Sequence, residues 1–308
     1  MQIMRSTLLW ASRNGTLERV VRSSRAMRPL VSRFMPGETI DEAILAAKAL
    51  KAEGTPAILT YLGENVSTDA AADQTVAEYE RLFAAVRAAA VDVHVSIKLT
   101  QFGWDVDRAR ALDRVRALAR LAKAGNTMLP IDMEGSPYVE STIEAYERLA
   151  REFDNVALCL QAYLHRTPQD VQRLLPLKPY IRLVKGAYRE PASVALQSRT
   201  EVDARYRALG QQLLEASKSG ARVAFGTHDA RLLAQLRQDA KDRGVAEKSF
   251  EVQMLYGIQD TARRELAASG LRTRVLISYG KAWYPWFMRR LAEKPANLLL
   301  VGRNLFGS

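Results

Sequence analysis

The chain has little cysteine and little histidine. Its single cysteine, Cys159, cannot form an intrachain disulfide, and such scarcity is typical of a protein from a reducing compartment. Cys159 also lies inside an apolar run, so we interpret it as a core residue. The three histidines show no spacing that resembles a ligand set, which argues against a metal site.

Long apolar runs are missing as well. No stretch approaches the ~18 residues that a membrane-spanning helix requires. The N-terminal sequence MQIMRSTLLWASRNG contains too short an apolar stretch for a secretory signal. We therefore predict a cytoplasmic protein, and peripheral contact with the inner face of the membrane stays open.

Glycine-rich phosphate-binding motifs are absent too. The sequence contains neither G-x-G-x-x-G nor Walker A, one of which a doubly wound open sheet normally carries after its first strand. That architecture is therefore disfavoured. No Gly/Ser linker or low-complexity tract divides the 308 residues. We predict a single domain, 1–308, with a helical N-terminal segment over 1–54 and a barrel over 55–294.

What the chain does have is eight strand-like runs separated by helical patterns. The runs begin near residues 57, 93, 128, 156, 180, 222, 250 and 274. Alternation of this kind implies parallel pairing, because parallel neighbours need a long crossover connection. Eight units of roughly 31 residues approach the ~250 residues of a typical barrel. The sequence predicts an α/β protein with a (β/α)8 TIM-type barrel and a final helix that caps the active site.

Local helix signals support this register. Thr39 and Glu42 form a capping box before an amphipathic helix. The pairs 136–137 and 167–168 are each interpreted as a capping residue followed by a proline in the first helical turn. The range 192–219 is predicted to be the longest helical stretch, and a break into two pieces stays open.

Polar residues follow several strand-like runs where apolar ones would be expected. Lys98 ends one run, and Asp132 with Glu134 follows another, where paired acids suit a metal, a proton or a neighbouring cation. Arg182 and Lys185 bracket the end of the run that begins at residue 180, and two cations so close together are typical of a site with an anionic partner or cofactor. Barrel enzymes keep their active sites at this edge, so we predict an enzyme. Taken singly, each residue also fits an exposed strand end.

Two further groups extend this pattern. Gln161, Thr227 and His228 are suited to hydrogen-bond a cofactor ring or phosphate, and His228 lies just before a helix. Arg289 and Arg290 follow aromatic residues in the last helix, where tandem arginines can clamp a carboxylate. Two solvated arginines on a surface helix remain the alternative.

The net charge of +11 comes from 45 basic and 34 acidic residues. Most of these are mixed along helices such as 105–125, which is typical of solvated helix faces. The range 13–28 is more one-sided and is compatible with a lipid surface, although a basic helix packed on the barrel is favoured. A nucleic-acid binder would also use this charge, but it would leave the polar strand ends unexplained.

Ordered motifs across essentially the whole chain resemble the monofunctional bacterial proline dehydrogenases and the proline-oxidising domain of bifunctional proline utilisation A enzymes. The motifs are YLGENV (61–66), SIKLTQFG (96–103), IDMEGS (131–136), LQAYLHRT (160–167), IRLVKGAYRE (181–190), FGTHD (225–229), FEVQMLYG (250–257) and YGKAWYPWFMRRLAEKPAN (279–297). The resemblance implies a barrel that binds FAD without a Rossmann domain. It also implies oxidation of L-proline to Δ¹-pyrroline-5-carboxylate, the first step of proline catabolism, with electrons passed to a membrane quinone.

The resemblance also assigns roles to residues. Asp132 and Arg182 occupy the catalytic positions. Substrate contacts are implied for Lys98, Glu64, Tyr279, Arg289 and Arg290. Flavin contacts are implied for Met133, Gln161, Lys185, Gly186, Ala187, Thr227 and His228. In this interpretation Asp132 holds Lys98, Glu64 pairs with Arg289 to close the site, and Tyr279 forms an aromatic wall of the proline pocket.

One departure and one alternative remain. Relatives often carry tyrosine three residues before the tandem arginines, whereas this chain has Trp286, which puts tolerance of hydroxyproline in doubt. Lysines at strand ends, Lys98 and Lys185, also suit a Schiff-base aldolase on the same barrel.

Overall fold

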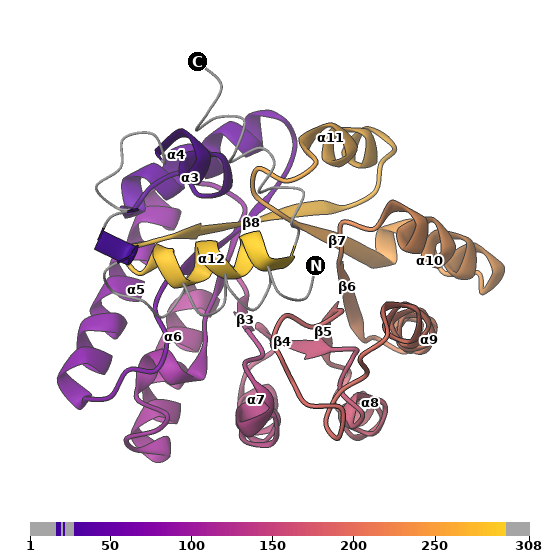
Figure 1. Cartoon of the computed structure of the whole chain (residues 1–308), viewed down its shortest axis with the longest axis horizontal. Helices are drawn as coiled ribbons and strands as arrows, with labels where there is room; N and C mark the ends of the chain where they lie inside the picture. Colours follow the sequence, from indigo (N-terminus) through magenta and orange to yellow (C-terminus); the bar gives the residue numbers. More distant parts are fainter. Residues whose placement is uncertain (1–16, 20, 22–27, 294–308) are drawn as a thin grey trace.

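The computed structural model describes residues 17–19, 21 and 28–293, with side chains described for residues 31–288 of the last range. A ring of parallel strands lies at the centre and helices surround it (Figure 1). The strands are β1 (Ala57–Tyr61), β2 (Val93–Ser96), β3 (Leu129–Ile131), β4 (Val156–Gln161), β5 (Tyr180–Val184), β6 (Arg222–Gly226), β7 (Phe250–Leu255) and β8 (Thr273–Tyr279). The predicted barrel is therefore confirmed, and each strand begins within one residue of its expected position.

The strands follow the order β2-β1-β8-β7-β6-β5-β4-β3, and all of the neighbouring pairs in that order are parallel. The remaining seam joins β2 to β3. A parallel bridge links Ile97 with Ile131, and the Asp132 amide donates to the Ile97 carbonyl over 2.8 Å. The amides of Val95 and Ile97 add bonds to the carbonyls of Met128 and Pro130. These contacts close the ring directly beneath Lys98 and Asp132.

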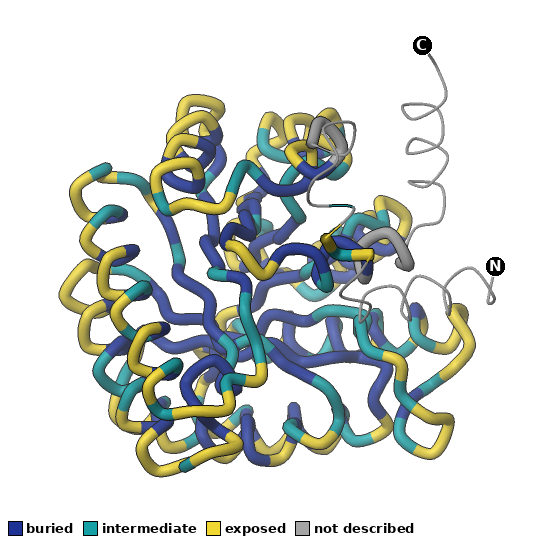
Figure 2. The backbone as a smooth tube through the Cα atoms, turned by 60° about the vertical axis from the view of Figure 1, so that its left-hand side comes forward, coloured by how far each residue is buried: buried dark blue, intermediate teal, exposed yellow. Residues whose placement is uncertain are grey.

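Helices connect the strands and cover the outside of the barrel. They are α3 (Arg28–Phe34), α4 (Ile40–Ala52), α5 (Asp69–Ala89), α6 (Arg108–Ala124), α7 (Val139–Glu152), α8 (Thr167–Leu174), α9 (Arg199–Ser217), α10 (Ala230–Asp242), α11 (Asp260–Ala268) and α12 (Trp283–Glu293). Short 3-10 turns are η1 (Leu99–Phe102), η2 (Ser136–Tyr138), η3 (Leu175–Leu177) and η4 (Glu247–Ser249). Figure 2 shows buried backbone in the strands and exposed backbone on the outer helical faces.

Residue patterns explain both layers. The strands consist of aliphatic runs that are buried on both faces, as parallel strands covered by helices must be. The helices bury one stripe each: α7 buries Val139, Ile143, Tyr146 and Leu149 at helical spacing. Among the described residues, no helix combines the length and apolarity that crossing a bilayer demands.

The local helix predictions were partly right. The Thr39–Glu42 capping box is present at the start of α4. The two cap–proline pairs are offset by one residue, because Ser136 and Thr167 are the first residues of η2 and α8 and make no cap bond. Their hydroxyl groups donate elsewhere, to Glu190 and to the Gln161 carbonyl.

The prediction for 192–219 was wrong in extent. The helix there, α9, begins only at Arg199, because Ser198 caps it and the preceding residues form a turn and an isolated bridge. It has 19 residues, whereas α5 has 21 and is the longest described helix.

A second apolar cluster joins α12 to α3 and to the end of β1. Its buried members are Val31, Phe34, Met35, Leu62, Trp283, Tyr284, Trp286, Phe287 and Met288. Gly257, after β7, has a φ of 70°, and a Cβ there would lie 1.6 Å from the Arg33 carbonyl oxygen. Glycine is therefore required where this loop meets α3. Because Leu62 directly follows β1, α12 lies at the carboxyl ends of the strands.

Candidate active site

The carboxyl ends of β2, β3 and β5 bring several predicted residues together. Nη2 of Arg182, on β5, donates to Oδ1 of Asp132, just after β3. Ser96, the last residue of β2, donates to the same oxygen over 2.6 Å. Burial opposes ionisation of Asp132, but attraction to Arg182 and Lys98 outweighs it, so the pKa of Asp132 is lowered. Asp132 is therefore held as a carboxylate inside the barrel mouth.

The expected direct pair between Asp132 and Lys98 does not form. Asp132 is bonded by Arg182 and Ser96 instead, and Lys98 acts on it through its charge. The guanidinium of Arg182 reaches across from β5, whereas Lys98 lies on the chain that leaves β2. Lys98 is half-buried at this edge.

Arg182 keeps unused hydrogen-bonding capacity. It is 7% exposed, and its Nε and Nη1 are buried with no nitrogen or oxygen acceptor among the described residues, although the Cys159 thiol lies beside the guanidinium. Leaving a buried N–H group without an acceptor costs about 1–3 kcal/mol. The arrangement therefore suits a bound molecule that offers acceptor atoms at this point.

Glu134 lies two residues beyond Asp132 and is 3% exposed. The Thr100 hydroxyl donates to its Oε1 over 2.7 Å, and the Thr100 amide donates to its Oε2 over 3.3 Å. Burial is the largest influence on Glu134 and raises its pKa to about 7. The two acids that follow β3 thus differ: Asp132 is ionised and Glu134 changes its charge near neutral pH.

Gln161 ties the ends of β3, β4 and β5 together. Its Nε2 donates to the Glu134 carbonyl over 3.0 Å, and its Oε1 accepts from the Ala187 amide over 3.4 Å. Gly186 has a φ of 126°, and a Cβ there would lie 2.3 Å from the Tyr163 ring. Only glycine lets the chain pass this close to the ring, which fixes the turn after β5.

Lys185 has carboxylate partners within the protein. Its Nζ donates to Asp203 of α9 and, over 2.9 Å, to Asp229, the N-cap residue of α10. Arg182 likewise pairs with Asp132, so both cations that bracket the end of β5 have anionic partners among the described residues. The protein therefore supplies anionic partners of its own for these two cations.

Thr227 and His228 shape the turn between β6 and α10. The Thr227 hydroxyl accepts from the Asp229 amide over 3.0 Å. His228 accepts through Nε2 from the Leu255 amide at the end of β7, over 3.0 Å. Since Nε2 acts as an acceptor, any ring proton is on Nδ1. The turn is thereby connected to the neighbouring strand.

Tyr279 lies apart from these residues. Its ring packs against Tyr61 with 5.4 Å between centroids, in the core shared with Tyr79 of α5, and it is 0% exposed. Side chains alternate along a strand, so Tyr279 faces the helices while Ser278 faces the barrel interior. The site assembled by the described residues therefore does not include Tyr279.

The remaining predicted residues are placed as follows. Met133 is buried in the main core, and Glu64 is half-buried after β1 and acts electrostatically on Glu134. Arg289 and Arg290 belong to α12, but their side chains lie outside the described residues. The predicted clamp and the pairing of Arg289 with Glu64 therefore stay predictions.

Two contributing residues were missed from the sequence. Ser96 orients Asp132, and Thr100 binds Glu134. Ser96 had a detectable signal, because it is a polar residue two positions before Lys98 and so lies on the same face of the strand. Thr100 had no comparable signal, since it follows the strand in an ordinary-looking turn.

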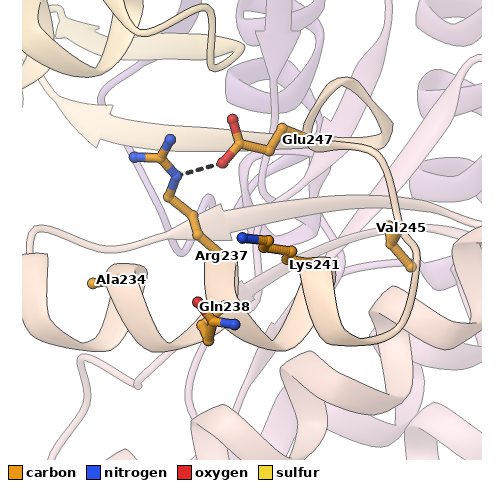
Figure 3. Close-up of a pocket in the computed structure, with 6 residues that line it drawn as sticks. All are labelled: Ala234, Arg237, Gln238, Lys241, Val245 and Glu247. Atoms are coloured by element: carbon orange, nitrogen blue, oxygen red, sulfur yellow. Dashed lines mark hydrogen bonds and ion pairs between the residues drawn. The ribbon is translucent and has the colours of Figure 1, made fainter.

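A hollow on the outside of the barrel differs from this site. It lies at α10 and η4, where Arg237 donates to Glu247 over 2.6 Å (Figure 3). Its lining residues are Ala234, Arg237, Gln238, Lys241, Val245 and Glu247. Within the part of the chain that the structure describes, no group of His, Cys, Asp or Glu is arranged to hold a metal ion.

Comparisons with known proteins identify the family and the fold. The sequence profile of the family described as "Proline dehydrogenase" matches residues 43–302. Proline dehydrogenase 1 of Bacillus subtilis is 36% identical over 300 residues, covering 97% of this chain and 98% of that protein. Proline dehydrogenase of Deinococcus radiodurans is 36% identical over 305 residues, covering 97% of each. Proline utilization A of Bdellovibrio bacteriovorus shares the fold with a TM-score of 0.84 at 23% identity; the alignment covers 98% of this chain but 39% of that one.

Proposed function

Because the chain belongs to the proline dehydrogenase family, we propose that it oxidises L-proline to Δ¹-pyrroline-5-carboxylate with bound FAD and passes the electrons to a membrane quinone. One structural observation carries the proposal beyond the family name. The buried Arg182–Asp132 pair lies at the carboxyl edge of the barrel and leaves two guanidinium nitrogens, Nε and Nη1, without nitrogen or oxygen acceptors among the described residues. Barrel enzymes bind their substrates at this edge.

The described residues fit a flavin at this place. The free N–H groups of Arg182 match the nitrogen and oxygen acceptors of a flavin ring, and Gly186 keeps the neighbouring turn compact. The residues that would hold the cofactor are Met133, Gln161, Lys185, Gly186, Ala187, Thr227 and His228. When bound, FAD supplies the two-electron acceptor that the reaction needs.

The protein's own groups have three tasks in this proposal. Proline must lose a hydride from a ring carbon and a proton from the ring nitrogen, so its amine has to be neutral when the hydride leaves. Lys98 and Arg182 make the local field positive, which favours the neutral amine and stabilises the negative charge that develops on the acceptor. Asp132 fixes Arg182 in place. The substrate carboxylate is assigned to Arg289 and Arg290 from their motif, with Glu64 as the closing acid.

A visible spectrum of the purified protein tests cofactor and substrate together. We expect a yellow protein whose absorbance bleaches with anaerobic proline and stays unchanged with other amino acids. A colourless protein without proline activity would contradict the proposal. If borohydride then linked a carbonyl substrate to Lys98 or Lys185, a Schiff-base aldolase would replace it.

The carboxylate clamp has a test of its own. We expect Arg289→Met to raise KM for proline by about tenfold to a hundredfold, because a charged hydrogen bond contributes about 1.5–3 kcal/mol. FAD should remain bound. Arg237→Met, in the outer hollow of Figure 3, is the matched control and should leave KM unchanged. Unaltered proline kinetics in Arg289→Met would refute the clamp.

The electron acceptor sets the proposed location. A quinone is dissolved in lipid, so we place the protein in the cytoplasm with peripheral contact at the inner membrane face. The net charge of +11 favours attraction to anionic lipids. The basic range 13–28 lies largely outside the described residues. Proline-dependent reduction of a quinone analogue tests the acceptor, and sedimentation with anionic vesicles tests the contact.

A further inference from the structure

Thr100 joins three segments at the carboxyl edge of the barrel. Its hydroxyl donates to Glu134 over 2.7 Å and accepts from the Asn65 amide over 3.1 Å. Its carbonyl accepts from the Val66 amide over 3.0 Å. Thr100 is itself 0% exposed, in the 3-10 turn that begins one residue after Lys98. The loop after β1, residues 62–66, is therefore attached through Thr100 to the acid that follows β3.

Glu134 is the fixed end of this chain of bonds. Both of its carboxylate oxygens accept from Thr100, and its carbonyl accepts from Gln161. It is 3% exposed, so the bonds are shielded from competing water. Asn65, at the other end, has a φ of 57°, a left-handed conformation that the surrounding bonds must hold in place.

We propose that Glu134 is a positioning residue of the active site, acting through Thr100 on the loop 62–66. This loop carries Glu64, and the turn that contains Thr100 adjoins Lys98, so one acid sets the place of both. The inference rests on the proposed function, because it takes Glu64 and Lys98 to face the substrate. Glu134 itself need not touch proline.

Charged and titratable groups around Glu134 make this contact sensitive to pH. Lys98 favours its charged form, whereas Glu64 disfavours it, and Tyr138 of η2 also interacts with its charge. The carboxylate can accept both Thr100 bonds, but a protonated carboxyl has one acceptor fewer for these donors. The attachment of the loop is therefore expected to tighten as pH rises through about 7, the pKa that burial gives Glu134.

Thr100→Val tests the contact by removing the hydroxyl while keeping the shape of the side chain. In the FAD-loaded enzyme we expect KM for proline to rise about tenfold, as one lost hydrogen bond to a charged group predicts, with a smaller change in kcat. Thr100→Ser restores the hydroxyl and should restore KM. Thr142→Val is the control, because Thr142 of α7 is equally buried and its hydroxyl has no partner among the described residues. A wild-type KM in folded Thr100→Val would overturn the inference.

Glu134→Gln supplies the second readout. Glutamine keeps the length of the side chain and an acceptor oxygen but does not titrate. We therefore expect kcat/KM of the wild type to rise with pH around 7, and this rise should be absent in Glu134→Gln. If the pH dependence of kcat/KM were the same in both proteins, Glu134 would not be the group that controls it.

Hydrogen exchange separates this inference from the proposed function. We expect the amides of Asn65 and Val66 to exchange faster in Thr100→Val than in Thr142→Val, with or without proline. Unchanged exchange would count against the positioning role. If the wild type failed to oxidise proline while exchange still increased, the proposed function would fail and the attachment of the loop would stand.

Discussion

Two buried arginine–carboxylate pairs lie in the barrel, one near each end of its strands. At the amino end, Arg274 of β8 donates through Nε to both oxygens of Glu251 on β7, and through Nη1 to the Ala57 carbonyl and Asp92. At the carboxyl end, Arg182 is bonded to Asp132 and keeps two nitrogens without acceptors among the described residues.

The two pairs differ in how completely the protein satisfies their hydrogen bonds. Tyr180 and Gln253 add hydrogen bonds to Glu251, so the pair at the amino end, here called the lower pair, is embedded in a network of protein groups. A buried pair with its bonds satisfied ties neighbouring strands together and offers little to a ligand. The Arg182–Asp132 pair at the carboxyl end, here called the upper pair, still has donors without acceptors. A substrate or cofactor that supplies the acceptors gains binding free energy there. In the proposed function, the pair at the amino end therefore stabilises the barrel and the pair at the carboxyl end serves the reaction.

The largest effect should come from breaking the lower pair. Arg274→Met leaves Glu251 buried without its cation, and such losses destabilise proteins by about 3–5 kcal/mol. We expect the free energy of unfolding to fall by this amount, measured by urea denaturation, while kcat of the folded fraction changes little. A large loss of kcat with unchanged stability would reverse the assignment of the two ends.

Breaking the pair at the carboxyl end should lower stability as well, because Asp132 also loses a buried cation, but here we expect an additional effect on the reaction. In the proposed function Arg182→Met removes donors that act on the reacting molecules, and loss of such a group lowers kcat by about 10²–10³-fold. Anaerobic proline should then bleach the flavin at a correspondingly lower rate, which stopped-flow absorbance measures. If the flavin were reduced at the wild-type rate, Arg182 would have no part in the reaction.

The pH dependence of stability sharpens the comparison at the upper end. The folded-state pKa of Glu134 is raised from 4.5 to about 7, so its contribution to stability is present below pH 4.5 and is lost as pH rises through 7. Relative to Glu134→Gln, which does not titrate, the free energy of unfolding of the wild type should fall by at most about 3 kcal/mol between pH 4.5 and 8. Thermal unfolding of both proteins across this range measures the difference. A constant difference would show that Glu134 titrates normally.

A helix cap provides a reference outside both pairs. Asp107 accepts from the amides of Ala109 and Arg110 at the start of α6. Asp107→Ala should lower the free energy of unfolding by about 1 kcal/mol and leave proline kinetics unchanged. Altered KM in this variant would mean that stability and function are not separated as the two arginine pairs suggest.

The strands, and the edge of the barrel at which several polar side chains gather, could be predicted from the sequence. Aliphatic runs between glycine, proline and charged residues mark the strands, and a parallel barrel brings all of their carboxyl ends to one edge. Asp132, Arg182 and Gln161 were therefore expected at the same edge: Arg182 is bonded to Asp132, and Gln161 donates to the carbonyl of Glu134, two residues after Asp132.

The partners of these residues could not be predicted in the same way. Asp132 was expected to hold Lys98, but Arg182 reaches it from a strand 50 positions away. Glu251 and Arg274 pair at the opposite end, and only the register of β7 against β8 brings them together. Tyr279 was assigned to the pocket, yet a shift of one residue along a strand reverses the face, and it packs against the helices.

The seam between β2 and β3 has a consequence for heat inactivation. Every other neighbouring pair in the ring shares a ladder of at least three paired residues, whereas these two strands meet at the single Ile97–Ile131 bridge and nearby backbone bonds. Lys98 and Asp132 stand on either side of that seam. If β2 and β3 separate first on warming, Lys98 and Asp132 move apart with them. In the proposed function, affinity for proline would then be lost at a lower temperature than the one at which the whole barrel unfolds.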